Sequence, residues 1–509
     1  MSLLGFLLAS GAIALTALLI YLRNRQQFWA KRNFPCAPNP HLIYGHSKGQ
    51  ITEKHAVDIN RKLYREFRDR GLSFGGVNFF MVPAVLIVDP EMVKTVLVRD
   101  FHVFHDRGIY SDPVADPLSG HLFLLEGQAW RTLRQKLTPT FTSGRMKSMF
   151  GTIVDVANEL TSFMENTYQA KPEMEMKDVL VRFTTDVIGT CAFGIRCNTL
   201  NNPDSEFLKN GEKVFEMKMT NMVKFVFASL YKDLARSIGV KLNDVEVERF
   251  FMGLVKDTVS FRETNNVQRN DFLNLLIQLK NKGYLADHAE QSDKEPVKLT
   301  LNEVAAQCFV FFIAGFETSS TTMNFCLYEL AMNPDIQERL RSEINEAIQS
   351  NGGNINYDLV MGIQYLDNVI NETLRKYPPL ESLNRVTNQD YRIPNTNHVI
   401  PNQTMITIPV HAIQHDPNHY PDPERFDPDR FLPENVKSRH PYVFIPFGEG
   451  PRICIGLRFG MMQAKMGLIT LLRGFKFSPS PMTPPSIVFD KKAFVLSPQG
   501  GNHLRVDKI

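Results

Sequence analysis

Cys454 lies in the densest group of chemically useful residues in the chain. The residues from Phe447 to Gly456 read FGEGPRICIG. Gly448 and Gly450 allow a positive φ and therefore a tight turn. Residues 455–471 favour a helix, so the Cys454 sulfur is expected at a helix N-terminus, where the dipole and open N–H groups favour thiolate over thiol. A thiolate braced by backbone donors can serve as the axial ligand of a haem iron, whereas a bare cysteine in a glycine-rich turn would be structural.

A second group of residues lies in the apolar run from Leu301 to Met332. Thr318 follows Ala314 by four residues, so its hydroxyl can bond the Ala314 carbonyl and loosen the helix there. Small side chains at Ala314 and Gly315 would let a flat cofactor and dioxygen approach. The Thr318 hydroxyl beside the Glu317 carboxylate could order water and pass protons to the reaction. The alternative is a buried threonine satisfied by its own helix, with Glu317 on a polar face.

The sequences of these segments resemble the conserved motifs of cytochrome P450. The haem-loop pattern FxxGxRxCxG is met in full by FGEGPRICIG, and further family motifs follow in order over almost the whole chain. These motifs are Trp130-xxx-Arg134, AGFET at 314–318, ETLR at 372–375 and PDRF at 428–431. The segments TFTSG, AGFETSSTT, ETLRKYPPL and FDPDRFLPEN are similar to insect microsomal enzymes of family six.

The resemblance implies haem b, with Cys454 as its proximal thiolate ligand and metal ligand. Trp130, Arg134 and Arg452 match family positions that contact the haem propionates, and Phe447 and Gly456 belong to the same haem-binding loop. Weaker candidates for the propionates are His121 and Arg385. A propionate-binding arginine of relatives is replaced here by Ser382.

Glu372 and Arg375 are three residues apart on one helical face and are therefore neighbours. The resemblance implies that they form a buried network with Arg430, which holds the haem loop in place. Arg425 occurs in a similar tetrapeptide, but the spacing to the haem loop favours Arg430. This network is expected to be structural.

The resemblance also places the substrate pocket along apolar segments, so the ligand should be lipophilic. Its candidate wall residues are Phe123, Phe309, Phe312, Ala314 and Phe316. Because aromatic residues at helical spacing are usually plain core, each phenylalanine could equally be a core residue.

No GxGxxG between a strand and a helix and no P-loop occurs in the sequence, so no dinucleotide site is visible. Electrons must therefore come from another protein. The resemblance implies NADPH–cytochrome P450 reductase, with cytochrome b5 as a further candidate.

Residues 1–22 carry no charged side chain, and basic residues follow at 23, 25, 31 and 32. A run of roughly 20 apolar residues can cross a bilayer as a helix. A cleaved signal peptide would want its basic residues first and a shorter apolar run. The pattern favours a single-pass membrane anchor with the catalytic domain on the cytoplasmic side. The resemblance implies that this membrane is the endoplasmic reticulum and that the protein is microsomal. A second segment, 217–230, is rich in Met and Phe and could lie in the membrane interface rather than span it.

Helical periodicity dominates the remaining chain, and strand-like runs are short. We expect a mainly α fold with a minor β region, organised as an anchor (1–22), a basic and proline-rich hinge (23–40) and one catalytic domain (41–509). The expected helices are Glu126–Lys136, Val154–Tyr168, Phe272–Lys280, Leu301–Met332, Pro334–Ser350 and Tyr365–Tyr377, and the expected strands are Ala84–Val88 and Thr404–Val410.

A net charge of +3 over 509 residues gives no reason to expect a nucleic-acid partner. The expected reaction is monooxygenation, RH + O2 + NADPH + H+ giving ROH, NADP+ and water, on lipophilic xenobiotics, hormones or lipids. Two alternatives are a reductase-independent isomerase or dehydratase of the same fold and a non-enzymatic haem-binding membrane protein. The intact pair of Glu317 and Thr318 argues against the first alternative. The sequence does not name the substrate.

Overall fold

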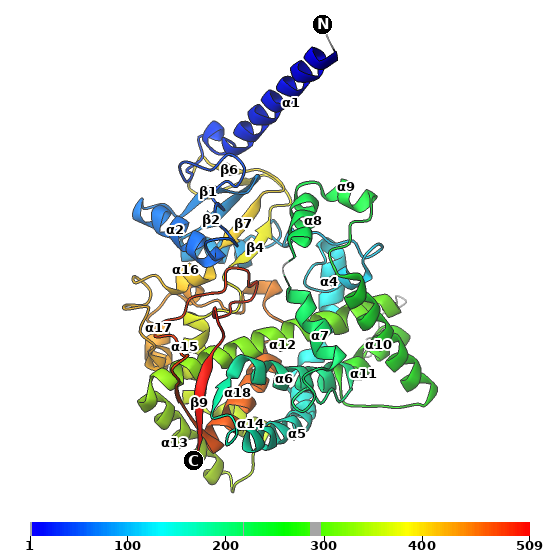
Figure 1. Ribbon diagram of the computed structural model, residues 1–509, viewed down its shortest axis with the longest axis vertical. Coiled ribbons are helices and arrows are strands. Elements are labelled where there is room, and N and C mark those ends of the chain that lie inside the picture. The colour runs from blue at the N-terminus through cyan, green and yellow to red at the C-terminus, as the bar shows by residue number, and fades with distance from the viewer. Residues whose placement is uncertain (1–2, 217, 286–296) are drawn as a thin grey trace. The chain divides into compact units, whose positions relative to one another are not determined.

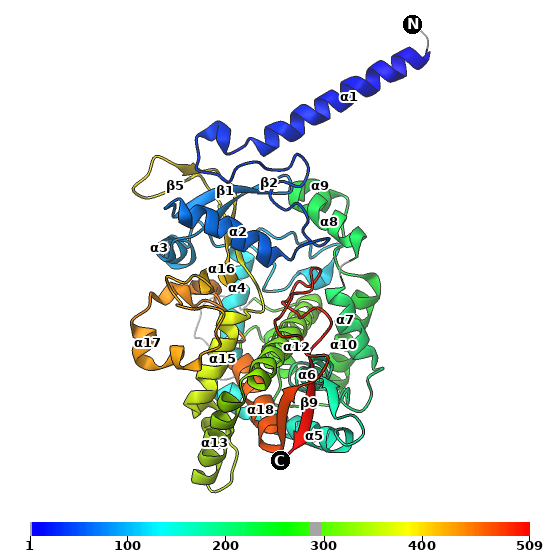
Figure 2. The same ribbon diagram turned by 60° about the vertical axis from the view of Figure 1, so that its left-hand side comes forward.

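The computed structural model describes residues 3–216, 218–285 and 297–509. Figures 1 and 2 show its helices and short strands. The chain falls into two compact units. The sheet unit comprises Met1–Gly108, Leu380–Pro421 and His440–Arg452, and the helical unit comprises the remaining segments, Ile109–Pro379, Asp422–Arg439 and Ile453–Ile509. The mainly α expectation is confirmed.

The sheet unit is built around four strands in the order β1-β2-β7-β4. β1 (Phe74–Phe79) and β2 (Val82–Ile87) form an antiparallel hairpin, β7 (Met405–Ile408) pairs parallel with β2, and β4 (Leu383–Val386) pairs antiparallel with β7. The inner strands carry fully buried aliphatic side chains, as expected of strands covered on both faces. The other elements of this unit are α1 (Leu3–Gln26), α2 (Ala56–Asp69), α3 (Pro90–Lys94), α16 (Val410–Gln414) and the β5–β6 hairpin (Tyr391–Arg392, Val399–Ile400).

Helix α1 is apolar, lies outside the core and is long enough to cross a membrane. It runs on past the expected anchor end at residue 22 to Gln26. Gln26 donates to the carbonyls of Leu42 (3.2 Å) and Phe80 (3.0 Å), and the buried Trp29 donates to the carbonyl of Val77 (3.0 Å). The segment expected as a hinge is therefore packed in part against the β1–β2 hairpin.

The helical unit is organised around α12 (Leu301–Met332), whose N-terminus is closed by a capping box between Thr300 and Glu303. Other helices of this unit include α4 (Gly127–Leu137), α5 (Ser143–Thr167), α6 (Met176–Ile188), α7 (Glu206–Phe215), α10 (Val245–Thr264), α11 (Phe272–Asn281), α13 (Pro334–Ser350), α15 (Gln364–Lys376) and α18 (Leu457–Gly474). A three-stranded sheet, ordered β3-β9-β8, joins β3 (Glu173–Glu175), β8 (Phe475–Pro479) and β9 (His503–Lys508). α12 and α13 match their expected bounds, and the other expected elements are found with shifted ends.

Candidate functional site

The turn that precedes the candidate ligand has the geometry that its glycines predict. Gly448 and Gly450 have φ of 71° and 72°. A Cβ atom at Gly450 would lie 2.1 Å from the Leu97 carbonyl oxygen, so only glycine fits there. Arg452, 3% exposed, donates to the His105 carbonyl and approaches an Asp106 carboxylate oxygen at 3.2 Å. These contacts, all in the sheet unit, fix the direction of the loop as it reaches Cys454.

Cys454 itself lies just before α18, not inside its first turn. The helix begins at Leu457 with Gly456 as its N-cap, so the expected helical start at residue 455 is two residues early. Cys454 is the one exposed cysteine of the six. Burial raises the pKa of the other five thiols, which makes each of them a poorer thiolate.

Helix α4 carries Trp130 and Arg134, two of the residues expected to contact the haem propionates. Trp130 and Arg134 are one turn apart on α4 and therefore share a face; Trp130 is buried. Burial lowers the pKa of Arg134, and the nearby Cys454 opposes that shift. No carboxylate among the described residues pairs with Arg134, so its guanidinium is available to an anionic group.

A second arginine, in the sheet unit, also suits an anion. Arg385 on β4 is 2% exposed, and its Nη1 donates only to the Asn384 carbonyl, while its Nε has no hydrogen-bond partner among the described residues. Burial lowers its pKa to about 9, and the positive charge of Arg452 adds to that shift. A buried guanidinium with so little negative charge beside it fits a carboxylate such as those of a haem. Arg385 was only a weak candidate from sequence.

Between two buried stretches, helix α12 has one short stretch of partly exposed residues. Its residues 304–312 and 319–331 are buried, whereas Ala314 is exposed. Thr318 donates its hydroxyl to the Ala314 carbonyl at 2.6 Å, as the four-residue spacing predicts. Gly315 has a different purpose from the one expected. A Cβ atom there would lie 2.4 Å from Cδ1 of Ile188 on α6, so its small size permits helix packing rather than cofactor approach.

Glu317 is held by a residue that the sequence did not indicate. Lys177 on α6 lies 2.9 Å from a Glu317 carboxylate oxygen, and both side chains are 15% exposed. Lys177 also donates to the hydroxyls of Ser320 (2.9 Å) and Thr321 (2.8 Å). Burial lowers the pKa of Lys177 while Glu317 raises it. The segment around Lys177 carries no signal of this pairing, because the two residues are far apart in the chain.

A second unexpected residue is Gln463, fully buried on α18, whose amide reaches the Gly315 carbonyl at 3.5 Å. Close contact between α18 and α12 is fixed by Gly467, where a Cβ atom would lie 2.5 Å from the Met323 sulfur. The helix that follows Cys454 is thus packed directly against the helix that carries Thr318.

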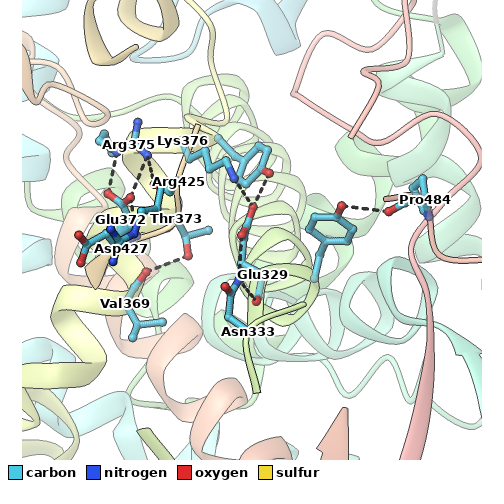
Figure 3. Close-up of polar contacts among 12 residues, drawn as sticks. Glu329, Asn333, Val369, Glu372, Thr373, Arg375, Lys376, Arg425, Asp427 and Pro484 are labelled. Atoms are coloured by element: carbon cyan, nitrogen blue, oxygen red, sulfur yellow. Dashed lines mark hydrogen bonds and ion pairs between the residues drawn. The ribbon is translucent and has the colours of Figure 1, made fainter. Parts of the chain in front are cut away.

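The structure brings the three residues of the expected buried network together, and Figure 3 shows two of them, Glu372 and Arg375. Arg375 binds both carboxylate oxygens of Glu372, at 2.6 and 2.8 Å, with no exposure of either side chain. Arg430 approaches the same carboxylate at 3.4 Å, and the Asp427 N–H donates to it at 3.0 Å. Arg425 contributes only its carbonyl, as a long acceptor for Arg375. Burial raises the pKa of Glu372, and its cationic and N–H neighbours oppose that shift.

Three of the expected pocket residues lie in the core. Phe309, Phe312 and Phe316 are at most 1% exposed. Phe312 stacks on Phe316 at 4.9 Å and meets Phe207 edge-to-face at the same distance, so these rings join α12 to α7 and α10. Phe123 is half-buried and Ala314 exposed, which leaves these two as wall candidates.

The family model for cytochrome P450 matches residues 35–505. The chain is 46% identical to a probable cytochrome P450 6a14 of Drosophila melanogaster, over 95% of each protein. It is 42% identical to cytochrome P450 6A1 of Musca domestica, over 99% of this chain and 98% of that one. This similarity, together with the loop and helix geometry above, shows that the chain belongs to the cytochrome P450 family of haem-thiolate monooxygenases.

Proposed function

We propose that this monooxygenase uses Cys454 as its haem ligand and oxidises lipophilic small molecules with electrons from NADPH–cytochrome P450 reductase. One observation carries the ligand assignment: Cys454 is the exposed thiol, and it follows a turn in which Gly448 and Gly450 both have positive φ. The remaining thiols are buried or half-buried and have raised pKa values.

Bound haem supplies the oxygen chemistry, which activates O2 and inserts one oxygen atom into the substrate. In the helical unit, Arg134 has no acidic partner among the described residues and would bind a propionate, with Trp130 on the same face of α4. In the sheet unit, Arg385 would do the same, and Arg452, which also contacts Asp106, would contact a propionate as the family resemblance implies. Phe447 and Gly456 would flank the ligand in the same loop. Glu372, Arg375 and Arg430 would act at a distance, by fixing the segment that leads to the haem loop.

Thr318 and Glu317 would move protons to the reaction. The Thr318 hydroxyl already donates to the Ala314 carbonyl, so its oxygen remains free to accept a proton from water and relay it. Glu317 is half-buried and paired with Lys177, which keeps the carboxylate in one place. We propose that Lys177 positions Glu317, and that water carries protons between Glu317 and Thr318.

Access for lipophilic substrates would come from the membrane. Helix α8 (Met219–Leu230) exposes Val223 (63%) and Phe225 (45%), and α9 (Lys232–Ser237) exposes Leu234 (52%). Apolar side chains on short helices favour an interfacial position. Phe227, in contrast, packs inward beside Ala228 and Tyr110. Met217, the first residue of the segment expected at the interface, lies outside the described residues.

Helix α1 would anchor the protein in the endoplasmic reticulum membrane, with both units on the cytoplasmic side. The basic residues Arg23 and Arg25 in its last turn support that orientation. An electron donor bound to the same membrane would then reach the protein by lateral diffusion, with cytochrome b5 as a further donor.

The ligand assignment is tested by Cys454→Ser, which should lose the thiolate-type absorbance of the reduced protein with carbon monoxide. Cys36→Ser is the matched control, since Cys36 is half-buried and outside the loop, and it should keep that absorbance. A Cys454→Ser protein that retained the thiolate spectrum would contradict the assignment. Product that forms only with NADPH and reductase would separate a monooxygenase from a peroxide isomerase and from a haem carrier.

A further inference from the structure

A surface cavity of the helical unit lies at the C-terminal end of α10 and shares no residue with the candidate haem site. It is formed by the last turns of α10, by the connection 265–271 between α10 and α11, and by residues 194–195, which follow a π-helical turn at Gly189–Phe193. Its volume is about 320 Å³. Small-molecule sites span roughly 300–1,000 Å³, so this cavity suits one small ligand.

One wall of this cavity is apolar and open to solvent. Phe261 on α10 is 60% exposed, and no aromatic ring among the described residues packs against it. Ile195 and Val267, both half-buried, line the same cavity. An exposed ring next to apolar side chains gains free energy when an apolar group covers it. The cavity therefore favours a ligand with an apolar body.

The cavity is also lined by two arginines, which share one buried carboxylate. Arg262, 4% exposed, donates to both oxygens of Asp271, at 2.8 and 2.7 Å. Asp271 also accepts from the Asn274 N–H at 2.9 Å, as the N-cap of α11. Arg269, 46% exposed, approaches the same carboxylate only with its Nε, at 3.4 Å, and pairs with no other acid in the part of the chain that the structure describes. Because Asp271 is already bound by stronger donors, Arg269 keeps N–H groups for a second anion.

The base of this cationic side is held rigidly. Arg262 donates to the Phe193 carbonyl at 3.2 Å. Gly194 has a φ of 68°, and a Cβ atom there would lie 1.9 Å from Nη2 of Arg262, so only glycine lets the Arg262–Asp271 pair approach the chain. Asp257 also lines the cavity, but it is exposed, so water screens its charge. A fixed cationic base beside an apolar wall is preorganised for an anion with an apolar body.

We propose that this cavity binds a single-chain fatty acid, with its carboxylate on Arg269 and its chain against Phe261 and Val267. A guanidinium binds a carboxylate through two parallel N–H···O bonds, which the unused N–H groups of Arg269 can supply. The small volume favours one acyl chain over the two chains of a phospholipid. This second site is independent of the proposed monooxygenase reaction, since none of its residues belongs to the haem loop or to α12.

The test uses the full-length haem protein in phosphatidylcholine nanodiscs, with clotrimazole bound to the iron so that the haem site is closed to the probe. Dodecanoate that carries a photoreactive diazirine on its chain is crosslinked to the protein, and the labelled peptides are identified by mass spectrometry. Labels should concentrate at 194–196 and 257–269. Dodecanol with the same diazirine should label these peptides roughly tenfold less, the factor expected for one lost hydrogen bond between charged groups.

Arg269→Gln should reduce labelling by dodecanoate about tenfold and leave labelling by dodecanol unchanged. Arg249→Gln is the matched control, because Arg249 is exposed on α10, lies outside the cavity and carries the same charge. Phe261→Ser should reduce labelling by both probes, since it removes the apolar wall. Carbon-monoxide absorbance checks that each variant holds haem.

Equal labelling of the Arg269→Gln and Arg249→Gln proteins would overturn the proposal, and so would labels spread evenly over the chain. Stronger labelling by dodecylamine with the same diazirine would also overturn it, because the cavity would then select a cation through Asp257. None of these measurements needs turnover, so a failure to form product from NADPH would count against the proposed function alone.

Discussion

Two acid–cation pairs of the helical unit, Glu372–Arg375 and Glu317–Lys177, use the same chemistry to different ends. The first pair is fully buried, with both carboxylate oxygens bound by one guanidinium and further contacts from Arg430 and the Asp427 N–H. In the second pair both side chains are 15% exposed, and the lysine also donates hydrogen bonds to two hydroxyls. A sealed, fully bonded pair gives rigidity, whereas a partly open pair can exchange protons with water. Burial of the pair, rather than its residue types, decides which role it can take.

A neighbouring buried acid shows that the first arrangement is not unique. Glu329 on α12 accepts from Lys376 (2.8 Å) and from the Tyr377 hydroxyl (2.5 Å), next to the Glu372 network (Figure 3). Burial and the Glu329 carboxylate raise the pKa of Tyr377 well above its usual value. This network joins α12 to α15. It therefore resembles the Glu372–Arg375 pair, in which buried ionic contacts hold elements rigidly together.

The largest effect is expected from Arg375→Ala, which leaves the Glu372 carboxylate buried without its main partner. Removal of one member of a buried pair costs about 3–5 kcal/mol. We expect little haem-loaded protein, measured as carbon-monoxide absorbance per mole of protein, and a lower melting temperature. A normal haem content in this variant would show that the sealed network is dispensable.

Thr318→Ala should keep haem and still consume NADPH, but it should clearly lower the product formed per NADPH, because a positioned acid–base group contributes roughly 10²–10⁴-fold to the step that it serves. The reducing equivalents from NADPH that do not reach the product should appear as hydrogen peroxide. Thr322→Ala is the matched control, since Thr322 makes the same kind of bond, to the Thr318 carbonyl at 2.9 Å, one turn further along α12. Equal coupling in the two variants would remove the proposed role of the Thr318 hydroxyl.

Glu317→Gln should destabilise the protein by about 1 kcal/mol at neutral pH, because Lys177 loses its charged partner. The pKa of Lys177, which burial already lowers, should fall further in this variant. Between the folded pKa and the unfolded value of about 10.4 the unfolded state binds more protons, so stability rises with pH. The deficit in melting temperature against the wild type should therefore shrink as the pH is raised from neutral to about 10. A deficit that does not change with pH would contradict the coupling of Glu317 to Lys177.

The smallest effect is expected from Glu165→Ala. Glu165 lies 2.7 Å from Lys508, a distance like those within the Glu372–Arg375 and Glu317–Lys177 pairs, but both side chains are 46% exposed. Solvent screens such a pair, so no measurable change in melting temperature or haem content should follow. A clear drop in melting temperature or haem content would mean that the short distance between the charges, and not their burial, determines how much such a pair stabilises the protein.

Local chemistry of the chain determined the helices, the positive φ at Gly448 and Gly450 and the Thr318–Ala314 bond, because each depends on neighbours within a few residues. α12 could be predicted to its end residues, since a capping box and a long apolar pattern act together. The start of α18 was missed by two residues, because the turn at 455–456 is a matter of loop geometry rather than propensity.

Only the tertiary structure decided which side chains meet across elements. The pairing of Lys177 with Glu317, the contact of Gly315 with Ile188 and the burial of Phe312 among other rings all join segments that are remote in the chain. A glycine or phenylalanine in a helical pattern gives the same sequence signal whether its side faces a cofactor or another helix. Packing removes that ambiguity, because the space beside one helix is set by the side chains of its neighbours.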